Sequence, residues 1–427
     1  MFVSFILLWT CGLFLILFIK CQRPKNFPPG PAPLPILGNL LNLSLDNPMK
    51  DFDRLWKSYG NVYSLFLGPK PAVVINGVQA MKEAMVTKAA DFAGRPQDIF
   101  VSDLTQRGMV LADYGASWRE HRRFALMTLR NFGLGKQSME QRILGEIQYT
   151  METLEKSIGA TLGPQVLFHN AASNIICQVL FGTRYDYDDS FIQVVVQCFK
   201  ENSKIANGPW AMLYDSIPMI RNLPLPFMKA DLFNGFIPSL CPSLSLLSER
   251  CQQEIDRVLA KRDHASYDDR RNMPYMQAVI HEVQRVANTV PLSVYHCTTS
   301  DTQLMGYSLP RGTLIIQNLN SVLNEEGQWK SPREFNPDNF LNDQGEFVKP
   351  EAFMPFSAGP RMCLGEGLAR MELFLITVTL LRRFKFIWPE DAGRPDYTPV
   401  YGVTLSPKPY CMKVQLRAKQ SPIFSET

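Results

Sequence analysis

Apolar residues fill the first part of the chain. Residues 2–19 carry no charge and are mostly Phe, Leu and Ile. Eighteen residues in a helix extend about 27 Å, enough to cross a bilayer core. Lys20, Arg23 and Lys25 follow at once, and positive residues beside a span stay on the cytosolic side. The pattern predicts a membrane anchor over 1–20 with the body in the cytosol, and a cleaved signal peptide is the alternative.

A proline-rich segment separates this run from the rest. Residues 21–45 include the stretch FPPGPAPLPILGN. Proline-rich chains without glycine repeats are semi-rigid spacers. We expect a hinge here that sets the angle between the anchor and a globular body over 46–427.

The rest of the chain contains a few strand-like stretches and longer helix-like stretches. Two stretches, 61–77 and 306–320, have the short apolar runs and Gly/Pro turns of strands. Helical periodicity dominates 80–196, 245–262, 273–290 and 364–384. Because helices outnumber strands and the strands cluster, the sequence predicts a mainly α fold with small β-sheets.

Composition narrows the function only slightly. The 427 residues are 46% hydrophobic and 20% charged, with a net charge of +4. So small a charge for this length gives no case for nucleic-acid binding. Nine scattered cysteines without a CxxC pair indicate a reducing compartment rather than a disulfide framework.

One cysteine lies in an unusual setting, the stretch PFSAGPRMCLGE. Gly359 and Gly365 allow backbone N–H groups to turn toward the sulfur of Cys363. Arg361 can offer several donors to a carboxylate. The positive end of the helix expected to begin near Leu364 would lie close to a thiolate. These features suit a deprotonated, metal-bound cysteine, whereas a lone cysteine is more often a buried structural residue.

The wider pattern resembles a known loop. Phe356, Gly359, Arg361, Cys363 and Gly365 match F-x-x-G-x-R-x-C-x-G, the haem-binding loop of cytochromes P450. The match of all five positions favours the metal site over the structural cysteine.

Three further stretches, all of which precede the loop, also match that family and occur in its order along the chain. HEVQR, with Glu282 and Arg285, resembles its E-x-x-R helix, and REFNPDNFL, with Asn339, resembles the segment that closes the same ion network. WREHRRF resembles the helix that carries Trp118 and Arg122 to the haem propionates. HEVQR is also close to the zinc motif HExxH, but Arg285 occupies the second ligand position and excludes zinc.

The resemblance implies a set of site residues. Cys363 would be the axial thiolate ligand of heme b (iron protoporphyrin IX), and Phe356 and Gly359 would shape its loop. Glu282, Arg285 and Asn339 would form a structural lock, and no side chain is expected to act as a catalyst in its own right. The haem propionates would be held by Arg361, Trp118, Arg122, Arg95 and His296. For Trp118, Arg95 and His296, an ordinary core position is the alternative.

The likeness extends over about 1–230 and 248–418 and is strongest to microsomal family 2 members. It implies a haem-thiolate monooxygenase on the cytosolic face of the endoplasmic reticulum. Electrons would come from NADPH through cytochrome P450 reductase, with a b-type cytochrome as a second candidate donor. One oxygen atom would enter a small lipophile such as a xenobiotic, a steroid or a fatty acid. Membrane lipid is the further expected partner.

One motif of that family is missing. The central helix with A/G-G-x-D/E-T-T/S, which serves oxygen activation, has no counterpart, and 230–250 reads as a proline-broken junction. We therefore expect an internal deletion near 230–250. The alternative function is that of a catalytically impaired haem-binding variant.

Overall fold

The computed structural model describes residues 22–44, 47–100, 108–131, 137–194, 244–260, 264–401 and 404–417, with residues 4, 12, 102, 197, 214, 215 and 262. The predicted anchor over 1–20, except residues 4 and 12, and the predicted junction as far as residue 243 lie outside the described residues. No described helix combines the length and the apolar composition that crossing a membrane requires.

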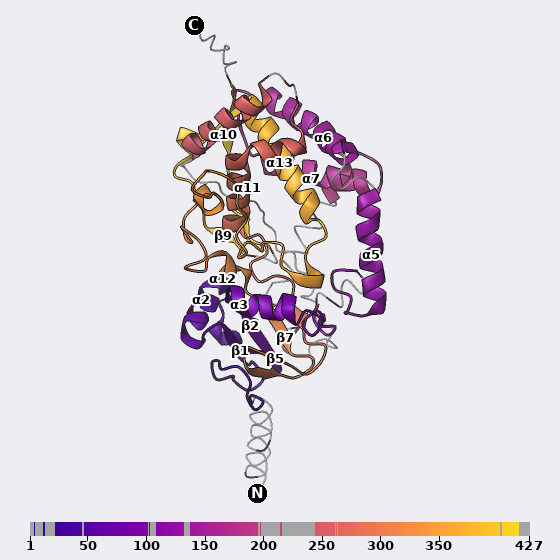
Figure 1. Ribbon diagram of the computed structural model, residues 1–427, viewed down its shortest axis with the longest axis vertical. Helices are drawn as coiled ribbons and strands as arrows, with labels where there is room; N and C mark the ends of the chain where they lie inside the picture. Colours follow the sequence, from indigo (N-terminus) through magenta and orange to yellow (C-terminus); the bar gives the residue numbers. More distant parts are fainter. Residues whose placement is uncertain are drawn as a thin grey trace.

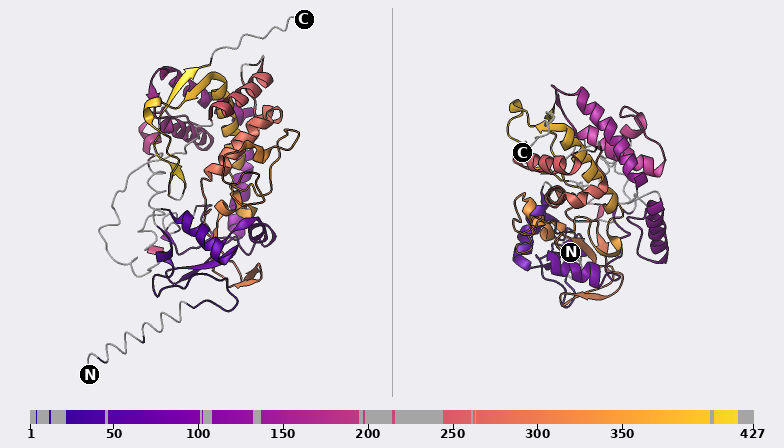
Figure 2. Two further views of the ribbon diagram at one scale, coloured as in Figure 1. Left: turned by 90° about the vertical axis from the view of Figure 1, so that its left-hand side faces the viewer. Right: turned by 45° about the horizontal axis from the view of Figure 1, so that its top comes forward.

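The long helices gather at one end of the molecule and the larger sheet at the other (Figure 1). The two further views in Figure 2 show the same division. Helix α5 (Ala116–Asn131) runs along one side, away from the other helices (Figure 1). The helical end consists of α6 (Gln137–Lys156), α7 (Gln165–Leu180), α10 (Leu244–Leu259), α11 (Pro274–Ala287) and α13 (Glu366–Arg383).

The larger sheet has the strand order β1-β2-β7-β4. Its strands are β1 (Val62–Leu67), β2 (Lys70–Ile75), β7 (Leu314–Gln317) and β4 (His296–Cys297). The β1–β2 hairpin confirms the two strands predicted in 61–77. The stretch 306–320 does not form a hairpin, because β6 (Tyr307–Leu309) pairs with β5 (Thr302–Leu304) while β7 pairs with β2 and β4. The Pro-Arg-Gly turn therefore connects two different sheets.

The remaining elements are short. The strands are β3 (Thr161–Leu162), β8 (Phe384–Ile387), β9 (Pro399–Val400), β10 (Ser406–Pro407) and β11 (Met412–Leu416). The helices and helical turns are η1 (Leu40–Asn42), α2 (Pro48–Tyr59), α3 (Gly77–Lys82), η2 (Glu83–Thr87), η5 (Tyr267–Asn272), α12 (Leu319–Leu323), η6 (Pro337–Phe340), η7 (Gly359–Arg361) and η8 (Glu390–Ala392). The predicted mainly α fold with small sheets is confirmed.

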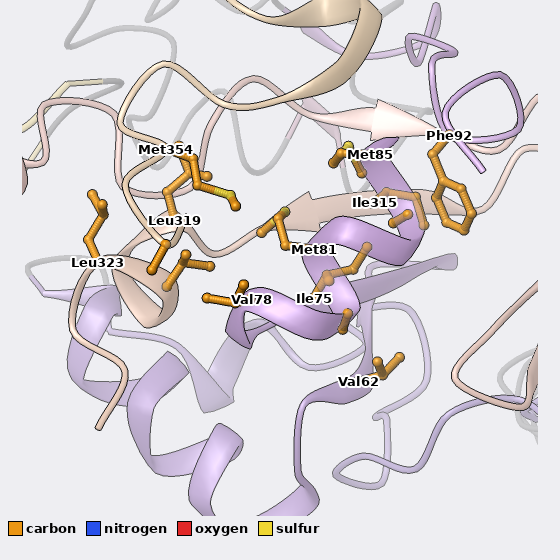
Figure 3. Packing of buried hydrophobic residues seen from close by; sticks show 14 of the residues in the cluster. Val62, Ile75, Val78, Met81, Met85, Phe92, Ile315, Leu319, Leu323 and Met354 are labelled. Atoms are coloured by element: carbon orange, nitrogen blue, oxygen red, sulfur yellow. The ribbon is translucent and has the colours of Figure 1, made fainter. Parts of the chain in front are cut away.

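Two large apolar clusters form the core. One packs the main sheet against α3, η2 and α12, where Met81 and Met85 lie beside Ile315 of β7 (Figure 3). The other joins α6, α7, α10, α11 and α13. Helix α11 contributes Ala278 to the first cluster and Ile280 to the second, so this helix connects the two halves of the core.

A buried ion pair fixes the C-terminal half of α11. Glu282 and Arg285 are one helical turn apart, and both side chains are completely buried. Arg285 donates to the two carboxylate oxygens of Glu282 at 2.7 and 2.8 Å. Asn339 of η6 donates to the same carboxylate at 3.2 Å. Arg285 also donates to the carbonyl oxygens of Leu323, Pro332 and Glu334. The three residues expected to form a lock are thus in contact.

The proline-rich segment is docked onto the sheet rather than free. Arg23 donates from Nε to Ser64 Oγ at 2.8 Å and from Nη2 to the carbonyl oxygen of Pro31 at 2.6 Å. Asn39 is fully buried, and its side chain accepts from the backbone N–H of Phe66 at 2.8 Å. These contacts fasten the described part of the proline-rich segment to β1.

Candidate functional site

The stretch around Cys363, residues 355–366, is called the cysteine loop and forms a tight bend. The backbone N–H of Cys363 donates to the carbonyl oxygen of Phe356 at 3.1 Å. Helix α13 begins at Glu366, two residues later than expected, with Gly365 as its N-cap. A Cβ built on Gly365 would lie 3.8 Å from the sulfur of Cys363. The exposed sulfur therefore lies at the positive end of α13, which favours a negative charge there.

Gly359 brings the loop into close contact with η2. Its φ is +74°, and a Cβ at this position would lie 1.9 Å from the carbonyl oxygen of Met85. Only glycine fits both the dihedral angle and the gap. The loop therefore packs directly against the η2 turn.

Arg361 anchors the other side of the bend. It is 8% exposed and donates from Nε to the carbonyl oxygen of Ala93 and from Nη2 to that of Ala112, both at 2.8 Å. Its Nη1 is buried and has no hydrogen-bond partner in the described parts of the chain. A buried charged donor without a partner is costly, so this atom favours an anionic ligand.

Helix α5 brings two more of the predicted residues to the loop. The ring of Trp118 has the guanidinium of Arg361 4.0 Å from its centroid and that of Arg122 at 5.5 Å. Arg122 donates to the carbonyl oxygen of Met362 at 2.5 Å. The indole N–H of Trp118 already donates to the carbonyl oxygen of Met109 at 2.9 Å. Both guanidinium groups thus lie close to the ring of Trp118, and its single donor is occupied.

A groove of about 370 Å³ runs between α5 and the cysteine loop. It is lined by Tyr114, Trp118, Arg119, Arg122, Arg123, Leu126, Met127, Arg130 and Pro360. Four of these nine side chains are arginines, so the groove attracts anionic groups.

Arg95 and His296 lie together beneath the loop. Arg95 is 4% exposed and donates from Nη1 to the carbonyl oxygens of Val294 and Tyr295 at 2.8 and 2.7 Å. His296 Nδ1 lies 2.6 Å from the carbonyl oxygen of Phe92, so Nδ1 carries the proton. In that tautomer Nε2 can accept a hydrogen bond but cannot donate one.

The cationic side chains disfavour one another's charge. Burial, and then repulsion from Arg361, lowers the pKa of Arg95 to about 9. Burial also lowers the pKa of Arg361 to about 10, with Asp113 opposing that shift. Burial and the neighbouring Arg95 hold the pKa of His296 well below its ordinary value. An anion bound among these groups would stabilise the charges of Arg95 and Arg361, so the cluster fits the carboxylates of a haem.

Sequence reasoning missed several contributors. Met85 and Gln317 contact the cysteine loop or each other. The only sequence signal for Gln317 is that a polar residue ends an otherwise apolar strand. His281 also received no role from the sequence, and the structure buries it, with 6% of its surface exposed. It lies 2.5 Å from Arg370 through Nε2, and burial lowers its pKa to about 4.

Comparison with known proteins gives the family of the chain. The cytochrome P450 family profile matches residues 28–230 and 247–414. Cytochrome P450 2D3 of Rattus norvegicus is 36% identical over 485 aligned positions, covering 94% of this chain and 97% of that protein. Cytochrome P450 2F3 of Capra hircus is 35% identical, covering 96% and 99%. Cytochrome P450 2K1 of Oncorhynchus mykiss is 35% identical, covering 95% of each. The chain therefore belongs to the cytochrome P450 family and resembles its family 2 members.

Proposed function

We propose that this cytochrome P450 monooxygenase holds heme b through Cys363 and oxidises small lipophilic molecules. The observation that carries the proposal is Arg361, whose buried Nη1 has no partner in the described part of the chain although the rest of the group is tightly held. It lies two residues from an exposed sulfur at a helix N-terminus. A cofactor with a metal and carboxylates at its edge suits both groups.

Each residue would then have a separate role. A bound haem supplies the redox chemistry of oxygen, and a thiolate ligand favours cleavage of the O–O bond. Cys363 would bind the iron, while Phe356 and Gly359 hold the bend that presents the sulfur. Arg361 and Arg122 would donate to the propionates. Trp118, Arg95 and His296 complete the site by packing and charge, because most of their described donors already bind backbone carbonyls.

The reductase is the proposed electron donor, and a b-type cytochrome is the second candidate partner. Arg119, Arg123 and Arg130 of α5 are exposed beside the loop, and Phe124 is 68% exposed on the same helix. A basic surface with an apolar residue favours an acidic protein surface and speeds its association. Electrons delivered here would arrive on the thiolate side of the site.

We propose the cytosolic face of the endoplasmic reticulum as the location, with the anchor over 1–20. The described surface next to the anchor supports contact with lipid. Leu34, Ile36 and Leu41 are 46%, 49% and 74% exposed, and Arg23 ties this segment firmly to the sheet. Exposed apolar side chains beside a membrane anchor favour burial in the headgroup region.

The impaired haem-binding variant is the second candidate. The family match stops at residue 230 and resumes at 247. The alignment to the 2D3 relative spans 485 positions, whereas this chain has 427 residues, so dozens of aligned positions have no residue here. This break coincides with the predicted deletion and supports the loss of the oxygen-activation helix.

The test is the difference spectrum of the reduced, carbon monoxide-treated chain after purification with hemin. We expect a thiolate-type Soret band that Cys363→Ala abolishes. Cys411→Ala is the matched control, because Cys411 is a partly exposed free thiol outside the loop, and it should leave the band intact. A band that survives Cys363→Ala, or a folded chain that stays colourless, would overturn the assignment.

A further inference from the structure

We propose that Gln317 is a positioning residue that fixes the cysteine loop against η2. This inference rests on the proposed role of Cys363 for its functional meaning. Its structural content, a clamp that joins Met85, Gln317 and Ser357, can be tested on the chain alone.

Both ends of the Gln317 amide are engaged. Its Oε1 accepts from Ser357 Oγ at 2.8 Å, and its Nε2 donates to the sulfur of Met85 at 2.9 Å. A thioether sulfur can only accept, and a hydroxyl can donate, so the chemistry of the partners fixes this orientation of the amide. Gln317 thus links β7, η2 and the loop through one side chain.

The residue it holds has a strained backbone. Ser357 has a φ of +63°, which non-glycine residues seldom adopt. Its backbone N–H donates to the carbonyl oxygen of Met354 at 3.0 Å, and its side chain is held by Gln317. The adjacent residue, Phe356, accepts the hydrogen bond from the backbone N–H of Cys363. One peptide unit therefore separates the clamp from the hydrogen bond that positions Cys363.

The burial of Gln317 also calls for such a role. It is fully buried at the end of a strand whose other residues are Leu314, Ile315 and Ile316. A buried amide is unfavourable unless its groups are hydrogen-bonded, so an apolar residue would be the simpler choice for packing alone. The partners of this amide are the loop and the turn on which Gly359 is seated. Gly359 allows the loop to approach η2 closely, and Gln317 adds hydrogen bonds between the same two segments.

Hydrogen exchange on the full chain tests the clamp without haem. We expect Gln317→Leu and Ser357→Ala each to speed exchange of the Met362 and Cys363 amides about two- to tenfold, the range that one hydrogen bond gives. The double variant should exchange no faster than the faster single one, because both changes remove the same link. Amides of β1 and β2 should keep their rates. Gln303→Leu, on an exposed glutamine of β5, is the matched control.

A spectroscopic readout links the clamp to the thiolate. In hemin-loaded chains of equal haem content, the fraction with the thiolate-type band should fall in Gln317→Leu, and by less in Met85→Leu, which keeps the volume and removes the sulfur acceptor. Unchanged loop exchange, or effects of Gln317→Leu and Ser357→Ala that multiply, would overturn the clamp. If the unaltered chain gives no thiolate band, the proposed function fails and the exchange rates alone decide the clamp.

Discussion

At the scale of single residues, Gly359 is decisive because a side chain has no room there. We expect Gly359→Ala to lower the free energy of unfolding by more than about 3 kcal/mol, since a Cβ would lie 1.9 Å from Met85 O in a left-handed backbone. Urea denaturation measures this loss. Gly393 has a similar φ of +68° with a ψ of −163° and open space around it, so Gly393→Ala introduces backbone strain without a clash and should cost about 1–3 kcal/mol, less than Gly359→Ala. Equal losses would show that the close approach is unimportant.

Glu372 of α13 gives a pH-dependent prediction. Burial raises the pKa of this carboxyl from 4.5 to about 7. Its Oε1 has no hydrogen-bond partner in the described portion of the chain. Between pH 4.5 and 7 the folded chain keeps a proton that the unfolded chain loses, so the stability contribution of Glu372 falls as pH rises through this window.

Glu372→Gln resembles the protonated carboxyl at every pH. The variant and the unaltered chain should be equally stable near pH 4, and the variant should be more stable by about 2–3 kcal/mol at pH 8. Thermal unfolding at several pH values measures the difference between the two chains, which removes the effect of every other group. A difference that does not change with pH would contradict the assigned pKa.

At the scale of elements, the Glu282–Arg285 pair fastens α11 to η6 and to the segment before it. Glu282→Gln removes the charge that pairs with a fully buried guanidinium, and we expect a loss of about 3–5 kcal/mol of unfolding free energy. The control is Glu326→Gln, which breaks the exposed pair with Arg333 and should cost less than about 1 kcal/mol. Similar losses in the two variants, measured by urea denaturation, would argue against a buried lock.

The second prediction at this scale concerns the binding of the proline-rich segment to lipid. In a chain lacking residues 1–20, Leu34→Ser and Leu41→Ser together should reduce residual binding to phospholipid vesicles severalfold, because both apolar side chains are exposed beside the proposed anchor. Vesicle sedimentation measures the bound fraction. Val348→Ser and Leu416→Ser remove side chains of comparable exposure, 48% and 49%, elsewhere on the surface. If these controls reduce binding equally, the segment is not a lipid contact.

At the scale of the whole molecule, α11 joins the two apolar clusters. The cysteine loop directly precedes α13, which belongs to the helical cluster. The proposed monooxygenase and its impaired alternative differ in how tightly electron flow is coupled to product. With reductase, NADPH and a lipophilic test substrate, the impaired variant should consume NADPH and release mostly peroxide. Tight coupling of NADPH consumption to oxidised product would contradict an effect of the predicted deletion on catalysis.

The sequence by itself determined several helices and strands and the local pattern that marks Cys363 as a candidate ligand. The 61–77 hairpin, α10, α11 and α13 follow from periodicity and turn residues, which are local properties of the chain. The pattern from Phe356 to Gly365 identified the cysteine because its residues are close in sequence. These features need no knowledge of distant contacts.

Only the tertiary structure decided which donors remain available. Arg361 bonds to Ala93, 268 positions away, and Gln317 reaches Met85 and Ser357 across 232 and 40 positions. The burial of His281 and the occupied indole N–H of Trp118 likewise depend on packing. The physical reason is that hydrogen-bond satisfaction and burial are set by all the groups that surround an atom, and these come from segments that no local pattern brings together.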